Sequence, residues 1–437
     1  MTVPPARARL SPAVSAFVVL LSVLIPCGIQ AHDRADTSSA PALFFTRTQF
    51  SGSLRSGYWS SSRTLDDQAH LATAALWLKA ESRLTSQLHL TVEGWVRGDD
   101  LGREQASWGA LREAYLDLRL DTVDLRIGKQ IIVWGRADRL NPTDTLTPRN
   151  FTLLAVEEDD QRVGTPAIKL SYFVGRFSLT GIWLPHFAPH TIPLPHLAPS
   201  VRLREHSPSP TFAQWAVKLD HSGGIVDWSL SYFDGYDLIP DLRLGQVTAS
   251  PIAVTLTHNH IRVIGADAAW TLGRFGLRGE AAYTFTSDHN GRDPLVKNSF
   301  FFLVLGVDRT FLDSLNVNVQ YLLRMLTQFR DLEDIRDPFR RSAAVQIAAV
   351  TSQRDAVQHG ASLRIGYRWW QETLETECAG IVSFTRLDFL LRPKVIYAVN
   401  DRWKVSLGGD VMRGSRRTVF GRLRTNAGAY LEIRYSF

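Results

Sequence analysis

The ten residues GAYLEIRYSF, numbers 428–437, form the most regular pattern in the chain. Ala, Leu, Ile, Tyr and Phe occupy the odd-numbered positions, and mostly polar side chains lie between them. A period of two places the two sets on opposite faces of a β-strand. The stretch therefore predicts a strand with one apolar and one polar face, ending on an aromatic residue.

The same alternation recurs along the rest of the chain, for example over residues 87–96, 113–120 and 315–324. These segments run for ten to fourteen residues. Strands of soluble proteins average roughly 5–6 residues. A strand that crosses a bilayer at a tilt needs about 9–11 residues. The lengths therefore favour membrane-crossing strands over those of a soluble sandwich.

The connections between these strands alternate in length. Tight turns are expected near 85–86, 121–122, 175, 222–223, 273, 312–313, 371–372 and 400–401, and longer links at 56–69, 98–107, 135–162, 185–211, 234–259, 287–297, 328–357 and 414–421. Short turns on one side and long loops on the other are typical of outer-membrane barrels. We therefore predict an all-β fold, a transmembrane antiparallel up-and-down β-barrel of about 18 strands. The alternative is about 16 strands, because residues 343–351 read either as a strand or as part of a long loop.

Composition agrees with this fold class. The chain has 437 residues, of which 45% are hydrophobic and 21% charged. These values exclude a disordered chain, and beyond the first thirty residues no apolar run is long enough for a membrane helix. Six tryptophans near the expected strand ends suggest aromatic girdles around the apolar band: Trp95, Trp134, Trp183, Trp228, Trp270 and Trp403.

The amino terminus has the features of an export signal. Arg7 and Arg9 precede an apolar stretch from Ala13 to Ile25, and small residues follow up to Ala31. We predict a signal peptide over 1–31, a short periplasmic segment over 32–42 and the barrel over 43–437. Cys27 would leave with the signal, so Cys378 would have no partner for a disulfide within the chain.

The terminal strand resembles the strand that the barrel-assembly machinery recognises in bacterial outer-membrane proteins. The residues that carry this resemblance are Leu431, Ile433, Tyr435 and Phe437. It implies a location in the bacterial outer membrane, with that machinery, outer-membrane lipid and lipopolysaccharide as partners.

A second resemblance lies in residues 134–144, which read Trp-Gly-Arg-Ala-Asp-Arg-Leu-Asn-Pro-Thr-Asp. This element is similar to the Trp-Gly-x-x-Asp-x-x-Asn-Pro-x-Asp element that follows an early strand in porin-like outer-membrane families. The loop 135–162 also mixes both signs of charge, which favours a loop folded into the lumen that narrows the pore. The expected constriction residues are Arg136, Asp138, Arg139, Asp144, Arg149, Glu157, Glu158, Asp159, Asp160 and Arg162. The alternative is a structural loop sealed by its own salt bridges.

Further charges are expected on the lumen face of the strands: Glu113, Asp117, Arg119, Asp124, Arg126, Arg364 and Arg368. Arginine stays charged and binds carboxylate or phosphate with two hydrogen bonds. These residues could favour anionic solutes, or arginines at the outer rim could bind lipopolysaccharide phosphate. They could equally pair with one another and support the barrel wall, since acidic residues lie two positions away.

Other chemistries have little support in the sequence. A repeated Leu-Pro-His element at 184–199 includes His186, His190 and His196, but no carboxylate or thiol accompanies them, so we predict no metal site. No nucleophile elbow, phosphate loop or dinucleotide fingerprint occurs, so we predict neither an enzyme nor a cofactor. In an exported protein, the net charge of +6 requires no nucleic-acid partner.

The leading hypothesis is a passive outer-membrane channel or transporter for small solutes, with selectivity set by the loop 135–162. The first alternative is transport of hydrophobic or lipid-like molecules, which the apolar Pro-His loop and residues 300–302 favour. The second is a barrel that conducts nothing and serves as a scaffold. The sequence leaves the substrate, anionic or hydrophobic, the direction of transport and the oligomeric state open.

Overall fold

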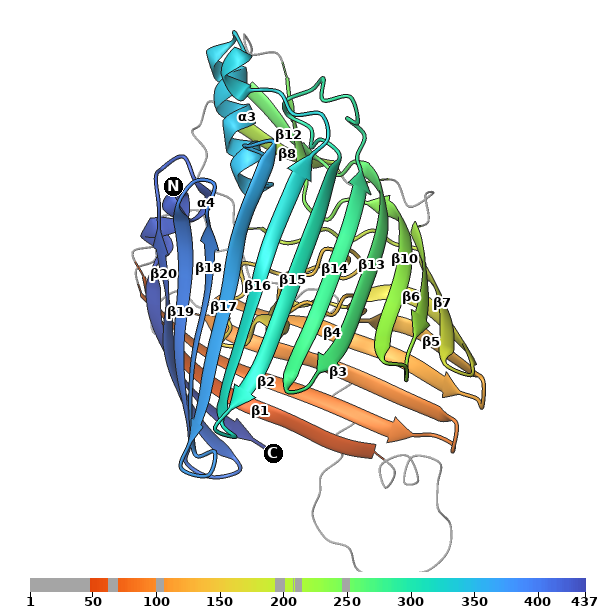
Figure 1. Cartoon of the computed structure of the whole chain (residues 1–437). Helices are drawn as coiled ribbons and strands as arrows, with labels where there is room; N and C mark the ends of the chain where they lie inside the picture. Colours follow the sequence, from red (N-terminus) through yellow and green to blue (C-terminus); the bar gives the residue numbers. More distant parts are fainter. Residues whose placement is uncertain are drawn as a thin grey trace, which may run out of the picture.

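The computed structural model describes residues 48–61, 70–99, 106–192, 201–206, 208, 214–245 and 252–437. In these residues one sheet of 18 strands closes on itself, because the last strand pairs with the first (Figure 1). Every neighbouring pair in this sheet is antiparallel, and each strand follows its neighbour along the chain. The predicted antiparallel barrel and its strand number of 18 are therefore confirmed, and the alternative of 16 is wrong.

The barrel strands are β1 (Thr48–Ser61), β2 (His70–Arg83), β3 (Leu88–Asp99), β4 (Ala106–Arg119), β5 (Val123–Gln130), β6 (Thr165–Val174), β7 (Phe177–Leu184), β9 (Gln214–His221), β10 (Val226–Tyr236), β13 (His260–Leu272), β14 (Phe275–Phe285), β15 (Phe300–Phe311), β16 (Leu315–Leu326), β17 (Val357–Trp369), β18 (Leu374–Ser383), β19 (Asp388–Ala398), β20 (Trp403–Arg413) and β21 (Gly428–Ser436). The eight expected tight turns all lie at one end of this barrel, and the longer links lie at the other, outer end (Figure 1).

Two details at the outer end differ from the sequence prediction. Residues 343–351 belong mostly to a helix, α3 (Pro338–Val350), which lies in the long link between β16 and β17. The sequence predicts eight outer connections, and the structure adds one more between β18 and β19, which are joined by only four residues, 384–387. A short outer loop breaks the alternation of lengths, so the pattern of lengths alone could not reveal it.

The two faces of the strands differ as the alternation requires. On β21, Leu431 and Ile433 are each 43% exposed on the outside, whereas Glu432 between them is 8% exposed and faces the lumen. Aliphatic side chains take the same outward position all around the barrel: Leu54, Ile127, Leu170, Leu230, Ile264, Leu305, Leu363 and Leu407. A closed barrel with an apolar outside and a charged inside is the fold of bacterial outer-membrane proteins.

The assignment of all six tryptophans to the girdles is wrong for two of them. Trp183, Trp270 and Trp403 are exposed on the outer face. Trp95 and Trp134 are buried inside, at 3% and 6% exposure. Trp95 occupies the same face of its strand as Glu93 and stacks against Trp77, so the alternation itself places it in the lumen.

The outer loops carry additional structure. Strands β8 (Val201–His206), β11 (Asp241–Leu244) and β12 (Ile252–Thr257) form a separate sheet of three strands. This sheet lies at the same end of the barrel as α3 and the short helix α4 (Val419–Arg422), as Figure 1 shows. Among the described residues, no helix has the length and apolar character that crossing a membrane requires.

Candidate functional site

The segment 131–164, between β5 and β6, is the longest of the connections whose residues are all described. It contacts inward-facing side chains of β1, β3, β4, β13, β14, β17, β18 and β19. In the closed sheet, β3 and β14 lie on nearly opposite sides of the barrel. The segment therefore runs across the lumen, and its contacts on the two sides differ in kind.

Glu280 on β14 binds the first half of the segment through the backbone. Its carboxylate accepts hydrogen bonds from the N–H groups of Arg136 at 3.0 Å, Ala137 at 3.0 Å and Thr143 at 2.8 Å. It also accepts from Oγ1 of Thr143 at 2.8 Å, and Glu280 is only 1% exposed. Hydrogen bonds to an ionised acceptor are roughly twice as strong as neutral ones, so Glu280 holds residues 136–143 firmly against the wall.

Gly135 allows this close approach. Its φ is +96°, a conformation that other residues rarely adopt, and a Cβ here would lie 2.5 Å from both oxygens of Glu280. The next residue, Arg136, turns its side chain to the wall and donates from Nε to Asp267 of β13 at 2.5 Å. Ser229 of β10 also donates to Asp267. Arg136 is thus bound to the wall, beside the glycine that gives the segment its path.

An apolar cluster supports the same half. Ile132, Trp134 and Leu146 from the segment pack against inward-facing side chains of β6 to β14: Ala167, Ile182, Leu184, Ala216, Phe233, Ile261, Val263 and Ala282. This patch of the barrel interior is covered by the segment instead of facing water. Burial of the large Trp134 side chain contributes a few kcal/mol to this docking.

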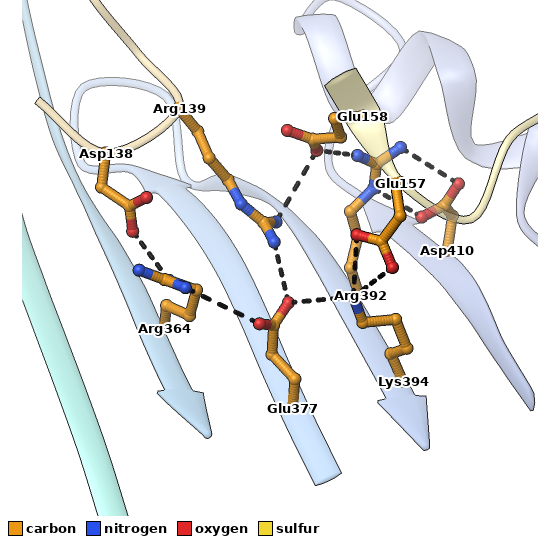
Figure 2. Close-up of polar contacts among 9 residues, drawn as sticks. All are labelled: Asp138, Arg139, Glu157, Glu158, Arg364, Glu377, Arg392, Lys394 and Asp410. Carbon is orange, nitrogen blue, oxygen red and sulfur yellow. Dashed lines mark hydrogen bonds and ion pairs between the residues drawn. The ribbon is translucent and has the colours of Figure 1, made fainter. Parts of the chain in front are cut away.

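The wall formed by β17 to β20 is bound by ion pairs instead. Figure 2 shows Asp138 next to Arg364, and Arg139 between Glu377 and Glu158. The Asp138–Arg364 and Arg139–Glu377 pairs are each 2.7 Å long. Arg139 has a φ of +68°, so its backbone is strained while its guanidinium reaches both carboxylates.

The acidic run 157–160 continues this network. Glu157 pairs with Lys394 of β19 at 3.2 Å, and Glu158 pairs with Arg392 of the same strand. Arg392 also pairs with Asp410 of β20 at 2.6 Å (Figure 2). Both signs of charge therefore occur on the segment and on the wall. This arrangement of local pairs differs from the opposed positive and negative surfaces that would create a field across the lumen.

The strands β1 to β4 hold the end of the segment. Arg55 of β1 pairs with Asp160 at 2.6 Å, and Arg112 of β4 donates to the backbone oxygens of Asp159 and Arg162. On β3, Arg97 donates to the oxygen of Leu154. Next to these contacts, Leu153 packs against Trp77 and Trp95. The carboxylate of Asp159 itself is 83% exposed and pairs with Arg162.

Contacts within the segment join its two halves. Asp144 pairs with Arg162 at 2.7 Å and lies 3.6 Å from Arg149. The N–H of Arg149 donates to Nδ1 of His190, in the next outer loop, at 2.9 Å. Burial of His190 lowers its pKa to about 4, so the ring is a neutral acceptor at pH 7.

A chamber of about 310 Å³ lies between the segment and the wall of β16 to β19. Its charged lining consists of Asp138, Arg139, Arg149, Glu158, Arg364 and Arg392. Leu140, Phe151, Ile381 and Leu390 contribute apolar groups to the lining. The volume is at the lower end of the range for small-molecule sites.

The structure places the predicted lumen charges in several groups. Asp117 accepts from Arg119 at 2.9 Å and from Arg126 at 3.2 Å, on the wall of β4 and β5. Glu113 accepts from the N–H of Ile131 at 2.8 Å, where the segment begins. Asp124 lies on the same face of β5 as Arg126, and Arg364 borders the chamber. Arg368 pairs with Glu372 beside a tight turn, away from the segment.

Most of the wall residues that bind the segment were not predicted from the sequence: Arg55, Arg97, Arg112, Asp267, Glu280, Glu377, Arg392 and Lys394. Each is a polar residue at an inward position of a strand, so the alternation could have placed it in the lumen. No local pattern indicates which of these residues meet the segment.

The comparisons with known proteins concern the fold. Neither a protein-family model nor a curated protein matches the sequence. Among solved structures, OccK5 (OpdH) of Pseudomonas aeruginosa aligns with a TM-score of 0.53 and 11% identity, over 90% of this chain and 99% of that chain. OccAB4 of Acinetobacter baumannii aligns with a TM-score of 0.53 and 9% identity, over 90% of this chain and 98% of that chain. OccK11 (OpdR) of Pseudomonas aeruginosa aligns with a TM-score of 0.50 and 10% identity, over 90% of this chain and 97% of that chain.

At these identities the comparison establishes a shared fold and nothing finer. The barrel architecture extends over nine tenths of this chain. The Trp-Gly-x-x-Asp-x-x-Asn-Pro-x-Asp element receives no support as a family marker. Its residues nevertheless have definite contacts here: Asn141 donates to the oxygen of Trp134, Asp138 pairs with Arg364, and Asp144 pairs with Arg162. The chain has the fold of a bacterial outer-membrane β-barrel.

Proposed function

We propose that this chain is an outer-membrane channel for the passive passage of small solutes, and that the segment 131–164 forms its constriction. The observation that carries the proposal is the chamber of about 310 Å³ between the segment and the wall. The segment occupies part of the lumen at this level, and the chamber beside it is the size of a small solute. Four arginines and two carboxylates line it, so its charge can discriminate between permeating ions.

Deletion of the inward part of the segment tests the proposal. Replacing residues 137–160 with a short Gly-Ser linker should raise the single-channel conductance several-fold in a planar bilayer. As a matched control, removing residues 289–292 from the β14–β15 connection should leave the conductance unchanged. An unchanged conductance after the first deletion, in a correctly folded barrel, would show that the constriction lies elsewhere.

The ion selectivity tests the role of the charged lining. Because arginines outnumber carboxylates in the chamber, the reversal potential under a salt gradient should show a preference for anions. A preference for cations would instead assign the dominant role to the acidic run from Glu157 to Asp160.

A second candidate function is a scaffold that does not conduct. It is favoured by the extensive pairing in the lumen, where Asp138, Arg139, Glu157 and Glu158 all have a partner on the barrel wall. A folded barrel that never conducts would support it. Clear solute flux through the purified protein would exclude the scaffold function. The Pro-His loop that suggested transport of hydrophobic molecules lies partly outside the described residues, at 193–200.

We propose that Leu431, Ile433, Tyr435 and Phe437 form the signal for the barrel-assembly machinery. Three of these, Leu431, Ile433 and Phe437, are exposed on the outer face, which supports recognition from outside the barrel. Replacing Phe437 with Ala should lower the amount of folded barrel in outer-membrane fractions, while urea-denatured protein should still refold in detergent. Equal losses in both assays would point to a structural role instead. Outer-membrane lipid and lipopolysaccharide would surround the same outward face.

A further inference from the structure

A second cavity, of about 270 Å³, lies on the outer side of the constriction. Leu140 and Ile381 line both this cavity and the chamber, so the two are adjacent. The outer cavity is bordered by helices α3 and α4 and by the barrel wall, and its apolar lining is formed by Phe302, Leu322, Ala348, Ala349, Val419 and Phe420. A solute that reaches the chamber from outside would pass this apolar surface first.

Arg324 gives the cavity a positive charge. Its guanidinium lies over the rings of Phe300 and Phe302, at 4.5 Å and 4.8 Å from their centroids. Nη1 donates to the backbone oxygen of Thr351 at 2.8 Å. Among the described residues, no carboxylate lies within ion-pair distance of it. The aromatic rings hold the guanidinium in place without forming an ion pair with it.

Arg354 adds a second such charge. It donates from Nη1 to the backbone oxygen of Arg417, and its Nε is buried without a hydrogen-bond partner in the described structure. The neighbouring Arg386 differs, because it forms two hydrogen bonds with Asp355, at 2.6 Å and 2.7 Å. Two carboxylates also line the cavity, but Asp355 pairs with Arg386 and Asp388 accepts from the N–H of Phe420. Within the described part of the chain, the cavity thus has two guanidinium groups without an ion-pair partner beside an apolar surface. The chamber below it differs, because its arginines are paired with carboxylates.

We propose that the outer cavity binds an amphipathic organic anion, with its apolar body against α3, Phe302 and Leu322 and its anionic group near Arg324 and Arg354. This inference rests on the proposed channel function, in which the cavity would collect such solutes ahead of the constriction. Each methylene buried against the apolar lining should tighten binding about fourfold. The anionic group supplies the charge that the two guanidinium groups lack.

The test measures binding of hexane-1-sulfonate to the full chain in lipid nanodiscs by titration calorimetry, with empty nanodiscs as the blank. Methanesulfonate has the same head group without the apolar body, and hexylammonium has a similar body with the opposite charge. We expect saturable binding of hexane-1-sulfonate at one site per chain and none of the other two at the same concentration. Equal binding of hexane-1-sulfonate and hexylammonium, or no binding of either, would overturn the proposal.

Two kinds of variant locate the site. Arg324→Gln and Arg354→Gln should each weaken binding roughly tenfold, as expected for a charge-assisted hydrogen bond. Ala348→Phe should weaken it by filling the cavity, without changing any charge. Arg274→Gln, at an exposed tight turn, is the matched control and should bind like the unaltered chain. If Arg354→Gln and Ala348→Phe both bind normally, the site lies elsewhere.

The conductance of the same preparations separates this inference from the proposed function. A barrel that conducts but does not bind hexane-1-sulfonate would contradict only the inference. A barrel that binds it but conducts no ions would contradict only the channel. If both hold, hexane-1-sulfonate added on the outer side should reduce the single-channel current reversibly, and Arg354→Gln should diminish this block.

Discussion

The two halves of the constriction segment are bound to the barrel by different forces. Residues 132–146 dock through an apolar cluster and through backbone N–H groups that donate to the buried Glu280. Residues 157–160 dock mainly through ion pairs between side chains, several of them partly exposed to the lumen. The first half meets β6 to β14, except that its Asp138 and Arg139 pair with β17 and β18, and the acidic run meets β19 and β1.

The difference shows how one loop can be both fixed and selective. Buried hydrogen bonds to an ionised acceptor are expensive to break, because the donors would be left without partners. Ion pairs near water contribute little net stability, since salt and solvent screen them. The first half therefore determines where the segment lies, and the charged half can vary without moving it.

The largest expected effect comes from Glu280→Ala. It would leave three backbone N–H groups without their acceptor and should lower the free energy of unfolding by about 3 kcal/mol. The segment should loosen, so single-channel currents should become larger and noisier. Thermal unfolding in detergent and bilayer recordings measure the two effects. Glu280→Gln retains one acceptor oxygen, so its stability and its currents should lie between those of Glu280→Ala and the unaltered chain. If Glu280→Ala behaves like the unaltered chain, the first half is held by its apolar contacts alone.

An intermediate effect is expected on acidification, through His190 beside the middle of the segment. Its pKa is 6.5 when released and about 4 when docked, because burial disfavours the protonated ring by more than the carboxylate of Asp237 favours it. Nearby Arg149, His258 and Arg162 lower the pKa further by smaller amounts. The released state therefore takes up the proton first as the pH falls. Docking is at full strength above about pH 6.5 and weakens down to about pH 4, by at most about 3 kcal/mol.

Limited proteolysis and current noise at pH 7 and pH 4.5 measure this weakening. His190→Gln retains an acceptor for the N–H of Arg149 but cannot take up a proton. We expect this variant to lose most of the pH dependence between these two values. An equally strong dependence in His190→Gln would assign the effect to other groups, such as the carboxylates of the segment.

The smallest effect on stability is expected from Glu158→Gln in the charged half. Glu158 is about one-third exposed, at 31%, and Arg392 keeps Asp410 as a partner. The free energy of unfolding should change by less than about 1 kcal/mol. The reversal potential should nevertheless shift toward stronger anion preference, because the chamber loses a negative charge. Glu333→Gln in an outer loop is the control; a large loss of stability in Glu158→Gln would remove the contrast between the halves.

Much of the fold could be read from local patterns. Alternation along residues 428–437 and its counterparts predicts the strands and their outward faces, because each side chain's face depends only on its own position in the strand. The tight turns could also be predicted from the local sequence, because they separate consecutive alternating segments. The helix α3 was not predicted because its Ala-rich stretch has no strong apolar periodicity. The outer turn at 384–387 was not predicted because it is as short as the turns at the other end of the barrel.

The contacts around the constriction depend on how the barrel closes. Arg139 and Glu377 pair at 2.7 Å across 238 positions of sequence, and the N–H of Arg136 meets Glu280 across 144. From the sequence Trp134 is predicted as a girdle residue, whereas in the structure it lies near the start of the segment that turns inward and is buried. Alternation is a property of one strand and is visible in the sequence. The partner of an inward charge is set by the register of 18 strands and by the path of one loop, which exist only in the folded barrel.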